Sequence, residues 1–178
     1  MKSKILILTA ICLAAGSCVK EKLETLYSKQ DTQIDTYISK ARVTGGDTLD
    51  VVYNKGSVRL IKTEGTGPAL EEGGSVSFYY AGYVFTSSPS SLFATNHQET
   101  AAGAGFTLTD DEYRIFEADM RSTQLLEGVR NGLIGVRSGE VCEIAFSGKY
   151  GFGDEVFGTI PVNSALLYKI WIVGVSNE

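Results

Sequence analysis

The sequence predicts an α+β protein in which a helical N-terminal segment precedes a domain of mainly antiparallel strands. Between residues 19 and 41, apolar residues recur at steps of three and four, which aligns them on one face of a helix. From residue 43 onward, apolar and polar residues alternate in short runs that end at glycine-rich turns, as they do in strands. A length of 178 residues with 43% hydrophobic residues suits one globular domain with extensions.

The first 17 residues have the features of a lipoprotein signal peptide. A basic start, Met1–Lys4, is followed by the apolar run Ile5–Ala14, which is too short to span a bilayer. Ala15-Gly-Ser-Cys18 then places small residues before a cysteine, as in a lipobox. We therefore expect lipidation of Cys18 and a lipid-anchored protein of the bacterial cell envelope, in the outer membrane or periplasm. The alternative is an ordinary signal peptide cleaved before Cys18.

Residues 18–42 are predicted to form a helical prefix. Asp31-Thr32 is expected to cap a second helix and to interrupt the first. Trp171 is out of register with the core-facing residues of the last strand, so we expect its side chain on the opposite face of that strand. A large aromatic side chain there is expected to be covered by another segment of the protein. The prefix is expected to provide that cover, or to form a homodimer, through the stripe Leu23, Leu26, Ile34 and Ile38.

The strand pattern occupies most of the remaining chain. Short strands are predicted at 43–44, 49–53 and 57–62, with turns at 45–47 and 54–56. Longer alternating runs follow at 75–82, 141–146 and 166–172. In the second of these, Cys142 has no cysteine partner and is interpreted as a small buried hydrophobic residue.

Several motifs occur in a family-like order and spacing. They are Glu64-Gly-Thr-Gly-Pro68, Ser75–Gly82, Leu125–Leu133, Lys149-Tyr-Gly-Phe-Gly-Asp154 and Thr159–Ile170. Together they resemble an FKBP-type peptidyl-prolyl cis-trans isomerase domain, which would span residues 43–178. The resemblance implies a bent antiparallel sheet wrapped around a short α-helix.

The resemblance also implies the site. The expected pocket residues are Tyr80, Phe93, Phe106, Leu125, Leu126, Val129, Phe152, Ile160 and Tyr168. Three positions depart from the family pattern: Ala94 replaces an acidic residue, Val129 a floor Trp, and Phe152 a Tyr whose hydroxyl reaches the ligand carbonyl. Tyr168 stands where the family usually has Phe. The pocket would keep its apolar walls and lose two polar groups.

Prolyl isomerisation suits such a pocket because it needs neither a nucleophile nor a metal. The barrier of about 18–20 kcal/mol is the loss of amide resonance when the C–N bond twists. A dry pocket disfavours the charge-separated planar form, and hydrogen bonds that fit the twisted form lower the barrier further.

Two segments exceed the minimal domain of this family. One is the loop Thr86–Ser91, and the other is an insertion at about 108–123. In the insertion, Thr109-x-x-Glu112 has the form of a capping box, and Tyr113, Phe116 and Met120 have helical spacing. We therefore expect an extra inserted helix beside the pocket rim.

Other chemistries fit the sequence less well. A net charge of −5 without a basic cluster argues against a nucleic-acid partner, and the single His97 lacks the partners of a histidine metal cluster. Asp110-Asp111-Glu112 could suggest a cation site, but at a helix start carboxylates favour the helix dipole. We expect no metal and no cofactor.

The leading hypothesis is an envelope isomerase of weak activity that binds proline-containing or apolar polypeptide segments. One alternative is a non-catalytic peptide-binding or chaperone module. The other is a surface lipoprotein that binds a glycan or a protein partner.

Overall fold

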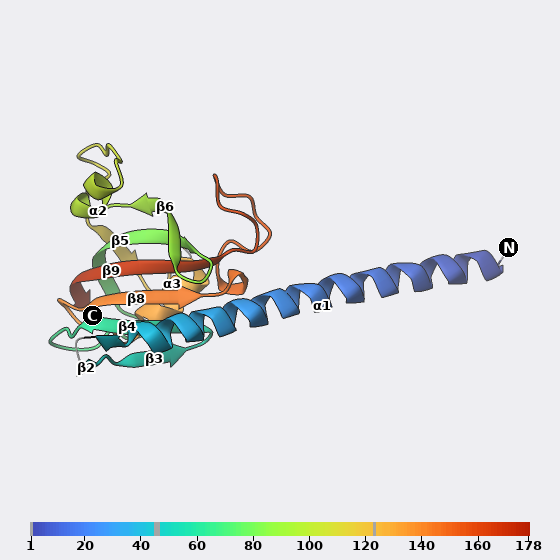
Figure 1. Ribbon diagram of the computed structural model, residues 1–178, viewed down its shortest axis with the longest axis horizontal. Coiled ribbons are helices and arrows are strands. Elements are labelled where there is room, and N and C mark those ends of the chain that lie inside the picture. Colours follow the sequence, from blue (N-terminus) through green and yellow to red (C-terminus); the bar gives the residue numbers. More distant parts are fainter. Residues whose placement is uncertain (1, 45–46, 123) are drawn as a thin grey trace.

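The computed structural model describes residues 2–44, 47–122 and 124–178, excluding the side chains of residues 2–18 and 44. A long N-terminal helix, α1 (Lys2–Ala41), runs along a twisted sheet and continues beyond it (Figure 1). The predicted α+β class, with its antiparallel sheet, short helix and helical prefix, is confirmed.

The main sheet has the order β3-β4-β8-β9-β5-β6, and β7 also pairs with β5; neighbouring strands run antiparallel. The bounds are β3 (Val51–Asn54), β4 (Ser57–Thr63), β5 (Ser75–Phe85), β6 (Pro89–Thr95), β7 (Phe116–Asp119), β8 (Val141–Phe146) and β9 (Ala165–Ser176). A small ladder joins β1 (Val43–Thr44) to β2 (Asp47–Thr48). The expected strands are therefore present close to their predicted bounds.

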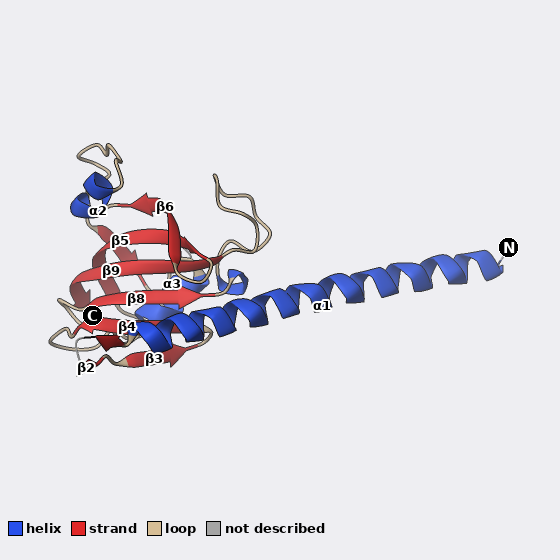
Figure 2. Ribbon diagram, in the orientation of Figure 1, coloured by secondary structure: helices blue, strands red, loops and turns tan. Residues whose placement is uncertain are grey.

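The short helix α3 (Glu127–Leu133) and the long helix α1 pack on opposite faces of this sheet (Figure 2). Alternation along β9 makes the division clear. Leu166 and Ile170 belong to the core that includes α3, whereas Leu167 belongs to the core that includes α1. We call these the inner and the outer face of the sheet.

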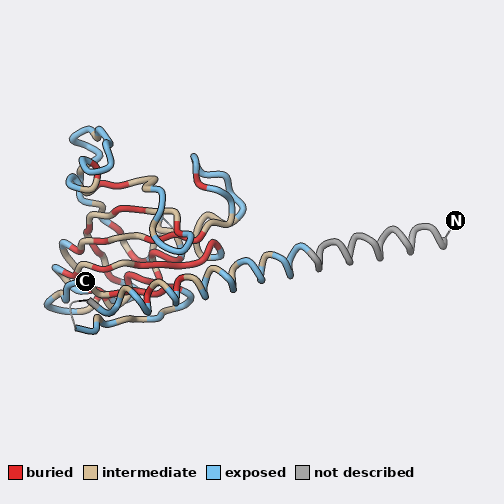
Figure 3. Tube along the Cα trace, viewed as in Figure 1, coloured by how far each residue is buried: buried red, intermediate tan, exposed pale blue. Residues whose placement is uncertain are grey.

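Helix α1 is held on the outer face by two residues of its apolar stripe. Ile34 and Ile38 are almost completely buried against residues of β4, β5, β8 and β9. Figure 3 shows the buried residues concentrated in the strands of the sheet. The predicted break at Asp31-Thr32 is wrong, because α1 continues through it. Thr32 bonds its hydroxyl to the Ser28 carbonyl one turn back, which is compatible with a helix interior.

Trp171 lies on the outer face, but the prefix does not cover it. The ring of His97 stacks on Trp171 with a centroid separation of 3.8 Å, and Lys169 Nζ lies 4.9 Å from the Trp171 ring centroid. The expected packing of the prefix against Trp171 is thus wrong. The cluster of described residues in which Ile34 and Ile38 are buried does not include Trp171 or His97.

The insertion also differs from expectation. An extra helix, α2 (Gln98–Gly103), is present, but residues 108–122 form loops, turns and β7 instead of the predicted helix. Only one half of the capping box forms: Glu112 accepts from the Thr109 N–H and hydroxyl, while the Glu112 N–H donates to the Thr109 carbonyl and closes a turn. Residues 116–119 are recruited as a strand by β5 because that pairing satisfies their backbone and buries Ala118.

The predicted signal segment and the lipidation site Cys18 lie outside the described side chains. Within the described residues, no helix has the length and apolar character required to cross a membrane.

Candidate functional site

The inner face carries a half-enclosed apolar cavity of about 300 Å³ beside α3. Its lining residues are Phe78, Tyr80, Phe93, Ala94, Phe116, Gln124, Leu125, Leu126, Val129, Phe152, Phe157 and Tyr168. Aromatic side chains dominate this lining. A cavity of this size and character suits an apolar group such as a proline ring with its neighbour.

Aromatic rings from adjacent strands form the walls. Tyr168 of β9 lies with its ring centroid 6.1 Å from Tyr80 of β5 and 5.8 Å from Phe93 of β6. Phe116 of β7 completes the wall at 6.2 Å from Tyr80, in an edge-to-face arrangement. The Phe93 ring can take its place in the wall because Gly82 has no side chain. A Cβ at Gly82 would collide with this ring.

Helix α3 supplies the floor. Val129 is buried beneath the aromatic walls, and Leu126 is the N-cap residue, whose N–H precedes the helical hydrogen-bond ladder. Gly128 and Gly132 let the helix approach β8 closely, because a Cβ at either position would overlap Phe146 or Ile144. The two glycines therefore set how deep the floor lies.

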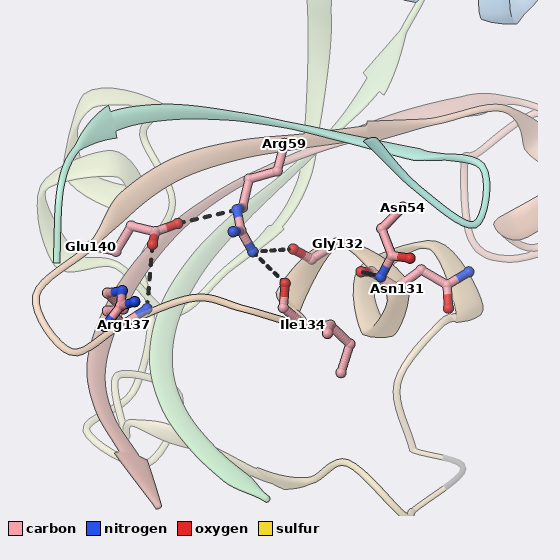
Figure 4. Close-up of polar contacts among 7 residues, drawn as sticks. All are labelled: Asn54, Arg59, Asn131, Gly132, Ile134, Arg137 and Glu140. Atoms are coloured by element: carbon pink, nitrogen blue, oxygen red, sulfur yellow. Dashed lines mark hydrogen bonds and ion pairs between the residues drawn. The ribbon is translucent and has the colours of Figure 1, made fainter. Parts of the chain in front are cut away.

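Polar side chains from β3 and β4 hold the carbonyl groups of α3. Arg59 donates from Nη1 to the carbonyls of Gly132 (2.9 Å) and Ile134 (2.7 Å), and its Nε lies 3.3 Å from Glu140 Oε1 (Figure 4). These bonds satisfy carbonyls at the helix C-terminus, which have no intrahelical partner. Arg59 and Glu140 are both nearly inaccessible to solvent.

Further bonds hold the rest of the helix. Ser57 donates to the Gly128 carbonyl at 2.7 Å. The Asn54 amide donates to the Asn131 carbonyl at 2.9 Å (Figure 4). The Asn131 amide donates in return to the carbonyl of Lys55. The floor of the cavity is thus tied to the hairpin formed by β3 and β4.

The mouth of the cavity is bordered by the segment between β8 and β9, which begins with the 3₁₀ helix η1 (Gly148–Tyr150). We call residues 151–164 the rim loop; it projects from the domain in Figure 1. Phe152 and Phe157 stack with a centroid separation of 4.4 Å and an interplanar angle of 7°. Phe157 is 55% exposed and its neighbour Val156 is 83% exposed, so the rim is apolar as well.

Two of the residues that line the cavity, Tyr80 and Tyr168, carry a hydroxyl group. Burial raises the pKa of both Tyr80 and Tyr168, and the proximity of Tyr80 raises that of Tyr168 further. Neither hydroxyl has a hydrogen-bond partner among the residues that the structure describes. Both are therefore protonated at neutral pH and able to donate to a ligand carbonyl.

Of the nine pocket residues predicted from the sequence, the structure brings seven together around the cavity. They are Tyr80, Phe93, Leu125, Leu126, Val129, Phe152 and Tyr168. Ile160 is instead buried in the core behind the cavity. The departures Ala94 and Phe152 both line the cavity, as expected.

The assignment of Phe106 to the wall is corrected. Phe106 is 37% exposed and follows α2, whereas Phe116 occupies the wall beside Phe78 and Tyr80. Sequence reasoning missed Phe116 because its spacing to Tyr113 and Met120 suggested a helix. The alternation of Phe116, Ala118 and Met120 was the available signal for a strand.

Among the side chains that the structure describes (19–43, 47–122 and 124–178), no group of three or more His, Cys, Asp or Glu is arranged to hold a metal ion. Cys142 is buried, and burial raises the pKa of its thiol, so it is not a thiolate nucleophile.

The cavity combines aromatic walls with the N-terminus of α3, and comparison with known proteins specifies the family. The family described as FKBP-type peptidyl-prolyl cis-trans isomerase matches residues 67–173, more than half of the chain. The chain belongs to this family. FK506-binding protein 1 of Aspergillus oryzae is 23% identical over 124 residues, which cover 68% of this chain and 99% of that protein.

Solved structures agree on the fold. FkpA from Escherichia coli matches with a TM-score of 0.55 and 17% identity, covering 98% of this chain and 72% of that one. A peptidyl-prolyl cis-trans isomerase from Pseudomonas syringae matches with a TM-score of 0.57 and 17% identity, covering 86% of this chain and 95% of that one. At this identity the likeness establishes the fold.

Proposed function

We propose that this protein is a lipid-anchored peptidyl-prolyl cis-trans isomerase of the bacterial cell envelope, with a weak activity on proline-containing or partly folded polypeptides. The observation that carries the proposal is the aromatic cavity over α3, in which the Tyr80 and Tyr168 hydroxyls have no partner among the described residues. An apolar proline ring would enter this cavity, and a hydroxyl would meet the neighbouring carbonyl.

Each part of the cavity has a role in this mechanism. The walls remove water from the prolyl imide and so disfavour its charge-separated planar form. The N–H of Leu126 and the hydroxyl of Tyr168 donate to carbonyl oxygens of the bound segment. Donors that fit the twisted imide better than the planar one lower the barrier.

The weakness of the activity follows from Ala94 and Phe152. Both residues line the cavity. The resemblance to other FKBP domains assigns these positions to a carboxylate and a tyrosine hydroxyl. Loss of one hydrogen bond that forms only in the twisted state costs about 1–3 kcal/mol, or about tenfold to a hundredfold in rate. The hydroxyl of Tyr168 is a new donor and compensates in part.

An isomerase assay on a Phe-Pro tetrapeptide tests this function. The wild-type chain is expected to accelerate isomerisation, and Tyr168→Phe should lower kcat/KM about threefold to tenfold while peptide affinity changes less. Phe is the family's usual residue here, so the variant should fold. An activity that is present in wild type and unchanged in Tyr168→Phe would remove the hydroxyl from the mechanism.

A second candidate is a binding or chaperone module without catalysis. The exposed apolar rim at Val156 and Phe157 favours this candidate, since it enlarges the surface available to an unfolded chain. Saturable binding of the tetrapeptide by the wild type, with no acceleration of its isomerisation, would select the binding module over the enzyme.

The anchor is tested separately. The lipobox before Cys18 motivates diacylation, and two acyl chains give stable membrane attachment, whereas one is marginal. Cys18→Ser should move the protein from the membrane fraction to the soluble envelope fraction. Absence of radiolabelled lipid on the wild type, with unchanged fractionation of the variant, would refute the anchor.

A further inference from the structure

The rim loop is held at its two ends, where it leaves η1 and enters β9. Gly148 and Asn163 touch at this base, and a side chain at Gly148 would collide with the Asn163 backbone. The N–H of Asn163 also donates to the Gly153 carbonyl. Between these ends, residues 154–159 are exposed. The position of Phe152 and Phe157 at the cavity mouth therefore depends on the base of the loop.

Helix α1, outside the segment that matches the family, reaches this base. The amide of Gln30 donates to the Asn163 carbonyl at 2.7 Å and accepts from the Gly148 N–H at 2.9 Å. Only one orientation of the amide satisfies both bonds, because one partner is an acceptor and the other a donor. One side chain thus links the two ends of the rim loop.

Tyr27, one turn earlier, adds a third bond. Its hydroxyl donates to Asn163 Oδ1 at 2.6 Å. Asn163 adopts a positive φ of 57°, a conformation that is uncommon outside glycine and that these contacts help to maintain.

The remainder of α1 is attached independently of the rim loop. Ile34 and Ile38 are buried on the outer face of the sheet, and the Tyr37 hydroxyl lies 3.0 Å from Glu143 Oε2 on β8. Removing the polar contacts of Gln30 should therefore leave the helix docked. This separation makes the contribution of Gln30 to the loop measurable.

We propose that Tyr27 and Gln30 are positioning residues of the peptide site: α1 holds the base of the rim loop and thereby places Phe152 and Phe157 at the mouth of the cavity. This inference rests on the proposed function of the cavity. It makes the N-terminal helix a part of the binding site and not only a spacer between an anchor and the domain.

The test compares Gln30→Met with Gln33→Met in the full chain. Both variants keep side-chain length and helix propensity, and Gln33 makes none of the contacts to the loop base. We expect Gln30→Met to raise KM for a Phe-Pro tetrapeptide about threefold to tenfold with a smaller change in kcat, as expected for the loss of two hydrogen bonds. Gln33→Met should change neither.

Hydrogen exchange provides a readout that does not depend on catalysis. Amides of residues 153–163 should exchange at least about tenfold faster in Gln30→Met than in Gln33→Met, with no change in β8 and β9. Tyr27→Phe, which removes one bond, should give a smaller change in the same direction. If loop exchange and KM are the same in Gln30→Met and Gln33→Met, the proposal is overturned.

Failure of the proposed function is distinguishable from failure of this inference. A wild-type chain that neither isomerises nor binds the tetrapeptide would refute the function. Faster exchange confined to the rim loop would in that case still support the link between α1 and the loop, and unchanged exchange would overturn it.

Discussion

The two faces of the sheet make different kinds of contact, although the same strands form both. Along β4, Val58 and Leu60 face α1 in an aliphatic seam, whereas Ser57 and Arg59 bond to the carbonyls of α3. The outer face is packed mainly by apolar side chains, including the edge-to-face pair Tyr37 and Phe85. The inner face combines polar clamps with aromatic rings that enclose an open cavity.

The difference shows where the chain is built for stability and where for binding. Apolar packing on the outer face buries Ile34, Ile38 and Leu167 almost completely. A pocket must keep space, and the inner face does so by fixing α3 through hydrogen bonds and close glycine contacts. The rings then surround a volume that no side chain of the domain fills.

The largest loss of stability is expected when the hydrogen bonds from Arg59 to the carbonyls at the end of α3 are removed. Arg59→Met would leave two helix carbonyls without their donor and Glu140 as a buried charge without its partner. Loss of one partner of a buried ion pair costs about 3–5 kcal/mol of unfolding free energy. Urea denaturation measures this cost. A loss below about 1 kcal/mol would mean that Arg59 does not fix the position of α3.

A substitution on the outer face should lower the stability of the protein without changing its affinity for a peptide. Leu167→Ala removes a buried side chain of the seam, which costs about 2–5 kcal/mol. Peptide affinity, measured by titration, should stay within about twofold of wild type because the change creates no space in the cavity. A loss of affinity as large as the loss of stability would show that the two faces are not independent.

On the inner face, the expected balance is reversed. Phe116→Ala should reduce peptide affinity about tenfold or more, because it opens a wall that contacts Phe78 and Tyr80. Phe106→Ala is the matched control, since Phe106 is exposed outside the cavity. Equal effects of the two substitutions would contradict the assignment of Phe116 to the wall.

The smallest expected effect concerns pH. Burial raises the pKa of Glu140 above its ordinary value, even though Arg59 opposes this shift. A raised folded-state pKa contributes stability that is present below the unfolded pKa and is lost as pH rises through the folded one. The unfolding free energy of wild type should therefore decline relative to that of Glu140→Gln as pH rises from about 4.5. Parallel curves for the two proteins would contradict the shift.

The strands followed from local alternation, as in the predicted run 166–172 that forms most of β9, whereas the short helix after Leu125-Leu126 was expected only from the family resemblance. The region 108–123 was mispredicted because Phe116 and Met120 fit both a helical and an alternating spacing. Pairing with β5 decided between them, and that pairing is a tertiary effect. Phe116 was missed as a wall residue for the same reason.

Contacts between residues far apart in the chain could not be predicted from local sequence patterns either. The apolar stripe of α1 predicted a buried face, but not that it would cover Leu167 and its neighbours instead of Trp171. The role of Gln30 rests on partners more than a hundred residues away, with no periodic signal. Polar clamps such as Arg59 are likewise visible only once the helix and strand are packed.

We propose that this pocket keeps the shape of an isomerase site but lacks two of its polar groups. The decisive measurement is kcat/KM on a Phe-Pro tetrapeptide for the double variant Ala94→Asp/Phe152→Tyr, which returns a carboxylate and a hydroxyl to positions that line the cavity. We expect kcat/KM to rise about tenfold to a hundredfold over wild type, since each group acts in a dry site. A double variant that folds and binds the peptide but shows no rise in kcat/KM would contradict the claim.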